Sequence, residues 1–186
     1  MSLQLTRHRF SFDDYHAMVA AGALKDDDRV ELIEGEIVDM TPIGSRHAAV
    51  VDRLTHWLVM GCGTRAIARV QGPVRLGAHS ESQPDLLVLE RRDDFYQSKP
   101  PTADDVLLLI EVADSSLQYD QAVKVPLYAR AGVREVWLVD LVRNEVQVHR
   151  EPAPGGFGFV ERRRRGASVE PFAFPDLSLR VDELLG

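Results

Sequence analysis

The stretch that decides the fold runs from residue 83 to residue 140 and contains apolar runs bordered by carboxylates. The first run reads Gln83-Pro84-Asp85-Leu86-Leu87-Val88-Leu89, and the second reads Asp105-Val106-Leu107-Leu108-Leu109-Ile110-Glu111-Val112-Ala113. Unbroken apolar runs of this kind are typical of strands covered on both faces, as in the middle of an α/β sheet. A carboxylate at the end of such a strand is costly to bury unless another group compensates its charge. Asp85 and Glu111 therefore mark a candidate site.

A lysine follows on the next helix. The sequence predicts a helix over 117–131 and a further buried strand over 134–140. Lys124 and Asp120 are four residues apart and share one face of that helix. Two acids and a lysine have the composition of a metal site, because a divalent cation takes carboxylate oxygens and an ammonium group can hold a water or stabilise an oxyanion. The alternative is that each acid ends its strand in solvent and that Asp120 and Lys124 form a surface ion pair.

The same residues carry a resemblance to a known family. Pro84-Asp85, Glu111 and Lys124 resemble the motif of the PD-(D/E)XK nuclease superfamily, and the block from Glu111 to Asp140 is similar to the Uma-type family of restriction endonucleases. The resemblance extends over residues 10–150. It implies an α/β (α+β) fold with a restriction-endonuclease-like core, in which helices flank a central mixed β-sheet.

The resemblance also implies roles for single residues. Asp85 and Glu111 would bind Mg²⁺ or Mn²⁺, and both would be catalytic together with Lys124. The usual lysine of the superfamily lies two residues after the glutamate, where this chain has Ala113, so Lys124 would replace it from the helix. The resemblance implies three further members of the site, Glu31, His47 and Asp120.

Several elements surround this core. The sequence predicts an N-terminal helix capped by Ser11 and a hairpin around Glu34-Gly35, together over 11–40. It also predicts a helix over 45–60 with Ser45 as N-cap, and one strand over 64–76 bent at Gly72-Pro73. Residues 144–186 are expected to form further strands and a short terminal helix. The N- and C-terminal hairpins are expected to extend the central sheet of a single domain, 1–186, with its core over 45–140.

The composition and net charge of the chain limit the classes of protein to which it can belong. The chain has 186 residues, 45% of them apolar, a formal net charge of −7 and one cysteine, Cys62. It has no apolar stretch long enough to span a membrane and no pattern of a signal peptide, and Cys62 cannot form an internal disulfide, so a cytoplasmic setting is expected. The negative net charge is unfavourable for tight binding of duplex DNA, because such binding depends on basic side chains that neutralise the phosphates.

Two charged segments leave alternatives open. The polar loop over 90–105 could overhang the site with Arg91, Arg92 and Lys99, or it could be a solvated loop. The basic run Glu161-Arg162-Arg163-Arg164-Arg165 could contact phosphates, and we favour instead an edge strand whose charges discourage sheet-to-sheet association.

The function predicted from these observations is metal-dependent hydrolysis of phosphodiester bonds in nucleic acid, with DNA as the favoured substrate. A homodimer is expected, because symmetric dimers are common and the hairpins could extend a sheet across an interface. One alternative is a nuclease-fold protein that binds a partner or nucleic acid without turnover, which the net charge and Ala113 favour. Another is a small-molecule phosphodiesterase, which would need no long basic groove.

Overall fold

The computed structural model describes residues 7–25 and 28–186. Within this part of the chain, no helix is both long and apolar enough to pass through a bilayer. The elements follow one another as α1 (Phe12–Ala20), β1 (Val30–Ile33), β2 (Glu36–Asp39), α2 (Ser45–Cys62), β3 (Ala66–Val70), β4 (Val74–Arg75), β5 (Glu81–Ser82), β6 (Leu86–Glu90), η1 (Ala103–Asp105), β7 (Val106–Ala113), α3 (Leu117–Tyr119), η2 (Asp120–Lys124), α4 (Val125–Ala131), β8 (Glu135–Asp140), β9 (Glu145–Ala153), β10 (Gly156–Arg164), β11 (Ser168–Val169), β12 (Leu179–Arg180) and α5 (Val181–Leu185).

A six-stranded mixed sheet forms the centre of the molecule, in the order β10-β9-β8-β7-β6-β3. Strands β7 and β8 are parallel, whereas the other neighbours are antiparallel. The apolar runs of β6, β7 and β8 lie in the middle of this sheet and are almost fully buried. Because both faces of these strands are covered, their sequences are continuously apolar, as the sequence predicted.

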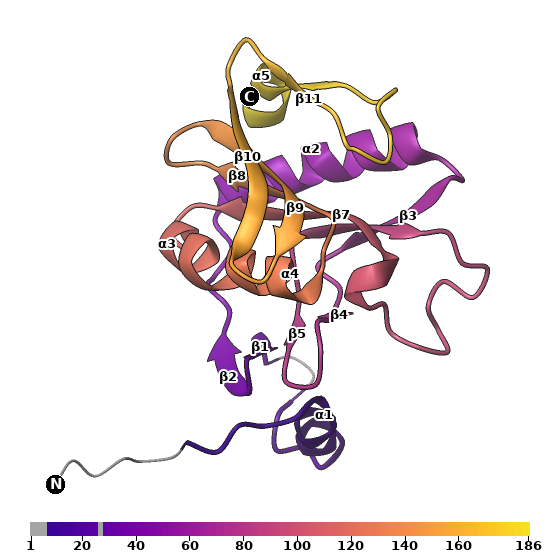
Figure 1. The fold of residues 1–186 in the computed structure, drawn as a ribbon, viewed down its shortest axis with the longest axis vertical. Helices are drawn as coiled ribbons and strands as arrows, with labels where there is room; N and C mark the ends of the chain where they lie inside the picture. Colours follow the sequence, from indigo (N-terminus) through magenta and orange to yellow (C-terminus); the bar gives the residue numbers. More distant parts are fainter. Residues whose placement is uncertain (1–6, 26–27) are drawn as a thin grey trace, which may run out of the picture.

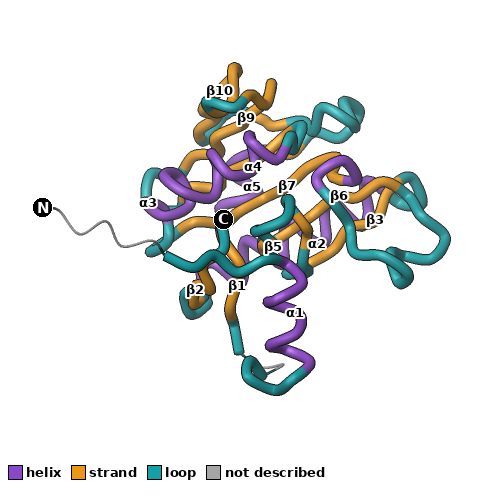
Figure 2. Tube along the Cα trace, turned by 60° about the horizontal axis from the view of Figure 1, so that its bottom comes forward, coloured by secondary structure: helices purple, strands orange, loops and turns teal. Residues whose placement is uncertain are grey.

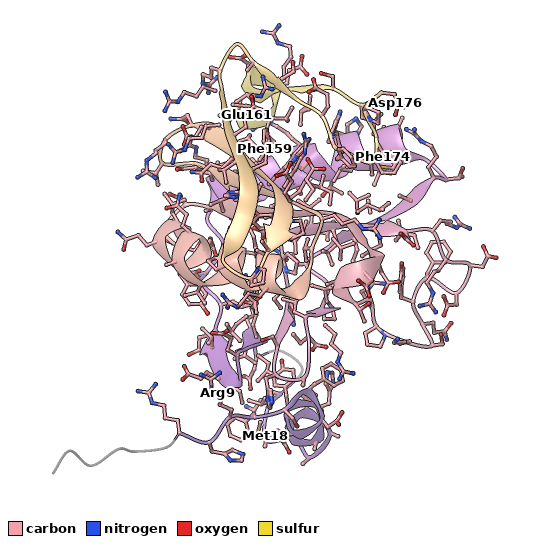
Figure 3. All side chains as sticks on the ribbon, in the orientation of Figure 1. Arg9, Met18, Phe159, Glu161, Phe174 and Asp176 are labelled. Atoms are coloured by element: carbon pink, nitrogen blue, oxygen red, sulfur yellow. The ribbon has the colours of Figure 1, made fainter. Side chains whose placement is uncertain are left out.

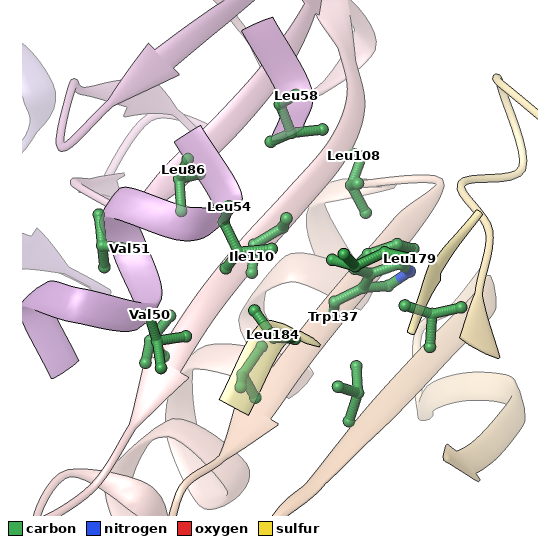
Figure 4. Packing of buried hydrophobic residues seen from close by; sticks show 14 of the residues in the cluster. Val50, Val51, Leu54, Leu58, Leu86, Leu108, Ile110, Trp137, Leu179 and Leu184 are labelled. Carbon is green, nitrogen blue, oxygen red and sulfur yellow. The ribbon is translucent and has the colours of Figure 1, made fainter. Parts of the chain in front are cut away.

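Helices cover both faces of the sheet (Figure 1). One face carries α2 and α5, whose apolar side chains pack on β6, β7 and β8 around Trp137, with Leu54 from α2, Ile110 from β7 and Leu184 from α5 in the same cluster (Figure 4). The other face carries α3, η2 and α4 on a second cluster that contains Leu109. This three-layer arrangement confirms the predicted α/β class with helices on a central mixed sheet.

The N-terminal part of the chain forms a separate, smaller sheet in the order β2-β1-β5-β4. The prediction that the N-terminal hairpin extends the central sheet is wrong in this detail, because β1 pairs with β5 instead. The segment 64–76 is likewise split: β3 belongs to the central sheet and β4 to the small one, and the break falls at Gln71-Gly72-Pro73. In Figure 2, α1 stands away from the central sheet. Its Ser11 cap is confirmed as a capping box with Asp14.

The C-terminal hairpin β9–β10 does extend the central sheet, and β10 is its edge strand. The basic run lies on this strand, as we favoured: Arg162 and Arg164 pair with buried Glu145, and Arg163 pairs with Glu161. Phe159 and Glu161 mark β10 in Figure 3. One expected helix cap differs. Gly44 rather than Ser45 is the N-cap of α2.

Candidate active site

A cavity of about 210 Å³ opens where the two sheets, the start of α2 and the helical segment α3–η2 meet. Its lining is unusually rich in acids: Glu31, Asp39, Asp85, Glu111, Asp114 and Asp120. The lining also includes Lys124, Arg29 and His47. All six residues that the sequence analysis proposed for the site therefore lie at one cavity.

Strand register explains why Asp85 and Glu111 meet. Leu86 of β6 is paired with Ile110 of antiparallel β7, so the residue before Leu86 and the residue after Ile110 are neighbours. Side chains alternate across a sheet, and both acids therefore fall on the face covered by α3–α4 rather than the face covered by α2. Both are almost fully buried. The alternative that each acid simply ends its strand in solvent is therefore wrong.

Lys124 joins two carboxylates from different sheets. Its Nζ lies 2.9 Å from Glu111 Oε1 and 3.0 Å from Glu31 Oε1. The lysine is buried, and none of the salt bridges among the described residues links it to Asp120, so a surface ion pair of these two residues is excluded. Glu31 is held in turn by the backbone N–H of Gln83, which donates to Glu31 Oε1 at 2.6 Å.

A local widening of the helix positions Lys124. Residues Asp120–Lys124 form a π-helical turn between α3 and α4, and the N–H of Val125 donates to the carbonyl of Asp120, five residues earlier. Pro126 follows within the first turn of α4 and has no N–H to donate to Ala122, which favours this irregularity. Single π-turns inside α-helices are rare and are frequent at functional sites. Here the turn places Asp120 and Lys124, both buried, at the cavity.

Tyr128 is a site neighbour that sequence reasoning missed. Its hydroxyl donates to Glu111 Oε1 and lies 3.3 Å from the hydroxyl of Ser82. The signal was present, because Tyr128 comes four residues after Lys124 and thus one helical turn further on the same face. An aromatic residue on the buried face of a helix is usually a packing residue, which is why the spacing alone did not single it out.

Three polar groups surround the carboxylate of Asp85. The backbone N–H of Val112 donates to Asp85 Oδ2 at 2.8 Å, and His47 Nε2 lies 3.0 Å from the same oxygen. Gln71 Nε2 contributes a long contact of 3.5 Å to Oδ1. His47 lies in the first turn of α2, as predicted from sequence, and its Nδ1 is a buried atom without a hydrogen-bond partner in the described part of the chain.

The concentration of acids perturbs the titration of the site. Burial raises the pKa of Glu111 to about 8, even though the Lys124 ammonium acts in the opposite direction, and Asp120, Asp85 and Glu31 raise it further. Burial also raises the pKa of Asp120, against the hydrogen bond donated by Ser116. Burial lowers the pKa of Lys124, but Glu111, Tyr128, Glu31 and Asp120 together outweigh it, so the net pKa lies well above the ordinary value. The carboxylates that line the cavity thus outnumber the basic side chains that line it.

The pKa of His47 is raised as well. The hydrogen bond to Asp85 raises its pKa, while burial opposes the shift. Protonated His47 would offer two N–H donors, one to Asp85 and one from Nδ1. When protonated, His47 would join Lys124 in bringing positive charge to the carboxylates of the cavity.

The donor set fits a hard divalent cation held by few protein ligands. Among the described residues, no group of three or more His, Cys, Asp or Glu side chains is arranged to enclose a metal ion. Mg²⁺ seldom requires such a group, since it usually keeps several waters and binds through one or two carboxylates and substrate phosphates. Asp85 and Glu111 provide carboxylates of this kind in a cavity that already lacks compensating charge.

The other charged segments named in the sequence analysis lie elsewhere. No described residue of the loop 91–105 lines the cavity. The loop joins the end of β6 to the start of β7, whereas Asp85 and Glu111 lie at the opposite ends of these strands, so it cannot overhang the site as one alternative suggested. Arg91 and Arg92 pair with Asp93 and Asp94 within the loop.

Comparison with known proteins assigns the chain to a family. The family model Uma2, described as "Putative restriction endonuclease", matches residues 12–182. The chain belongs to the Uma2 family. The crystal structure of a "putative nuclease belonging to DUF820" from Anabaena variabilis has the same fold, with a TM-score of 0.72 at 18% sequence identity over 95% of this chain and 97% of that one. No curated protein matches the chain. Uma2 membership confirms the family resemblance, and the structural match confirms the nuclease-like fold.

Proposed function

We propose that this Uma2 protein is a Mg²⁺- or Mn²⁺-dependent nuclease that hydrolyses phosphodiester bonds of nucleic acid. The observation that carries the proposal is the buried cluster in which Lys124 bridges Glu111 and Glu31 beside Asp85. Burial of several carboxylates around one lysine is unfavourable for a merely structural core, because their charges are not fully compensated. Membership of a family described as restriction endonucleases supports the same reaction.

Each residue has a distinct part in this proposal. Asp85 and Glu111 would hold the metal ion, which when bound polarises the phosphate and lowers the pKa of a bound water. Lys124 has three N–H donors, of which Glu31 and Glu111 engage two. No third partner of the ammonium lies among the described residues, so the third N–H could orient a water or stabilise charge on a phosphate oxygen in the transition state.

The remaining neighbours orient the charged groups. Tyr128 and Lys124 both contact Oε1 of Glu111, which fixes the carboxylate and leaves its Oε2 without a hydrogen-bond or salt-bridge partner among the described residues. His47 and the N–H of Val112 fix Oδ2 of Asp85 in the same manner. Asp120 is a further carboxylate at the cavity and accepts a hydrogen bond from Ser116 at 2.6 Å.

The test combines metal binding with cleavage. Calorimetry with Mn²⁺ should show binding to the wild-type protein and its loss in Asp85→Ala and in Glu111→Ala. Labelled oligonucleotides should be cleaved by the wild-type protein with Mn²⁺ and not in EDTA. Asp104→Ala is a matched control, because this acid lies in η1, outside the cavity, and its loss should change neither measurement. Unchanged Mn²⁺ binding in either site variant would remove that residue from the proposed metal site.

Two other outcomes would point to the alternative functions. Hydrolysis of a small aryl phosphodiester without cleavage of oligonucleotides would indicate a small-molecule phosphodiesterase. Nucleic-acid binding without turnover of any phosphodiester would indicate a non-catalytic nuclease fold. We also propose a cytoplasmic setting, consistent with the single cysteine Cys62, and a homodimer.

A further inference from the structure

The mouth of the cavity is more exposed and more apolar than its floor. Asp85 and Glu111 are 9% and 4% exposed, whereas Ile43 is 40% exposed. The segment 40–43, which links β2 to α2, contributes the apolar side chains of Met40, Pro42 and Ile43 to the lining. The half-buried ring of Tyr119, at the end of α3, lines the same cavity. A phosphodiester that reaches the buried carboxylates must bring part of its nucleoside among these groups.

The charges at the cavity do not suit a continuous duplex. Of its 19 lining residues, six are acids, and the basic side chains are Arg29, Lys124 and His47. Lys124 is already paired with Glu31 and Glu111. Binding to a duplex rests on several phosphates neutralised by Lys and Arg, which this lining cannot supply. Stacking on an aromatic ring does not depend on neutralised phosphates and accepts any base.

The most basic segment of the chain does not contribute to the lining of the cavity. Arginines 162 to 165 lie on and just after β10, three strands from β7 in the central sheet. Each is engaged by a carboxylate: Arg162 and Arg164 by Glu145, Arg163 by Glu161 and Arg165 by Asp182. None of the four arginines lines the cavity, although strand register sets Arg162 level with Glu111, three strand spacings away across β9 and β8.

We propose that the site takes an unpaired nucleotide, so that the substrate is single-stranded nucleic acid or an unpaired position within a duplex. The base leaves the stack and lies on the ring of Tyr119, close to Met40 and Ile43, while the adjoining phosphate reaches the cation that Asp85 and Glu111 would hold. The energy lost by unstacking is smallest for a base that is already unpaired, which gives the preference its physical cause. This inference rests on the proposed nuclease function and adds the substrate class.

The first experiment compares substrates under single-turnover conditions with Mn²⁺. A short labelled single strand and a duplex with one unpaired central base should be cleaved at least about tenfold faster than the fully paired duplex, because the unpaired base avoids the cost of unstacking. Versions of the strand in DNA and RNA identify which sugar is accepted. Equal or faster cleavage of the fully paired duplex would overturn the inference and leave the nuclease proposal intact.

The second experiment tests Tyr119 directly. A single strand containing 2-aminopurine is mixed rapidly with protein and Mn²⁺, and quenching of its fluorescence reports stacking before any cleavage. Tyr119→Ala should abolish the quench and raise KM for the strand by about tenfold, a usual strength for stacking on one ring. Tyr119→Phe, which keeps the ring, should behave as wild type. Phe95→Ala is the matched control, because Phe95 is exposed on the loop far from the cavity.

The two proposals fail in different ways. If no substrate is cleaved with Mn²⁺, the nuclease proposal fails, and the 2-aminopurine signal alone then decides the inference. A quench in wild type that disappears in Tyr119→Ala would support the stacking site, whereas no quench in wild type, or an unchanged quench in Tyr119→Ala, would overturn it. Melting curves of the variants establish that each is folded.

Discussion

Lys124 occupies a position in which its charge serves two buried carboxylates at once. Glu31 reaches it from the small sheet and Glu111 from the central one. Breaking a buried ion pair by removing one partner is costly, because the remaining charges stay buried without compensation. Lys124 therefore links the stability of the two sheets to the chemistry of the site.

Replacement of Lys124 by methionine tests this link. Lys124→Met should lower the single-turnover rate with Mn²⁺ by about a hundredfold or more, as expected for a lost charge-stabilising donor. At pH above 8, where Glu111 is ionised, it should also lower the free energy of unfolding by about 3 kcal/mol, since two buried carboxylates lose their partner. Lys99→Met, in the exposed loop, should change neither quantity. A full cleavage rate in Lys124→Met would exclude the lysine from catalysis.

Ala113 shows why the lysine comes from the helix. This residue lies two positions after Glu111, on the same face of β7, and it is fully buried in a cluster with Leu117 and Val125. A lysine at this position would have to displace these side chains, and overpacking of this kind destabilises a core. Ala113→Lys in the Lys124→Met background should therefore fail to restore cleavage and should lower the melting temperature further.

Glu111 makes stability depend on pH. Because burial raises its pKa from the model-compound value of 4.5 to about 8, the folded state holds a proton that the unfolded state releases between these values. The stability of the metal-free protein should thus fall as pH rises from 5 to 8. Melting in EDTA should show a decrease of at least about 3 °C, the effect of about 1 kcal/mol in a domain of this size.

Two controls identify Glu111 as the cause of this dependence. Glu111→Gln should flatten the profile and raise the melting temperature at pH 8, because its neutral side chain binds no proton and needs no compensation. Adding Mn²⁺ should have its largest stabilising effect at high pH, where the carboxylate is charged. A profile that stays the same in Glu111→Gln would assign the pH dependence to another group.

At the scale of elements, the hairpin β1–β2 delivers Glu31 to the site. Gly35 in its turn has φ +82°, and a Cβ there would lie 2.6 Å from Arg9 Cβ. Glu34 has a positive φ as well, so this tight turn depends on Gly35 for its second left-handed residue. The turn is also held by the backbone, since the N–H of Gly35 donates to the carbonyl of His79 at 2.7 Å.

Gly35→Ala should therefore weaken both the hairpin and the site. We expect the free energy of unfolding to fall by about 1–2 kcal/mol, the cost of a left-handed non-glycine residue, and cleavage to fall because Glu31 loses its position. Gly155→Ala is a matched control in the β9–β10 turn, where an added Cβ meets nothing within 4 Å and φ is not positive. Melting curves and cleavage rates of the two variants give the comparison. Equal behaviour of the two would show that the turn at Gly35 is not constrained.

At the scale of the whole molecule, the cavity is complete within one chain, so dimerisation and substrate preference are separate questions. The edge strand β10 remains the best candidate for contact between copies, because its outer backbone groups are unpaired in the central sheet and Val160 is 51% exposed. Its arginines act against such pairing, although their partners Glu145 and Glu161 reduce the net charge.

Sedimentation at micromolar concentrations tests the dimer. We expect a homodimer for the wild-type chain and a monomer for Val160→Lys, which places a further charge on the edge. Ser168→Lys, on β11 away from this edge, should remain dimeric. A wild-type monomer across the concentration range would rule out a stable dimer and would leave the single-chain site unaffected.

The sequence by itself determined most elements and the composition of the site. Apolar runs predicted β6, β7 and β8, and the family resemblance selected Asp85, Glu111, Lys124, Glu31, His47 and Asp120. These signals are local, because the period of apolar residues and the spacing of a motif are properties of short segments. The functional roles of the six residues remain predictions, whereas their meeting at one cavity is a finding of the structure.

Only the tertiary structure decided how distant segments meet. The small sheet, which separates β1 and β4 from the central sheet, brings Glu31 to Lys124, and no local pattern distinguishes pairing of β1 with β5 from extension of the larger sheet. The π-turn that turns Lys124 inward and the segment 40–43 that lines the mouth depend likewise on packing. Strand partners and cavity walls are set by contacts between residues far apart in the chain, whose energies no single segment contains.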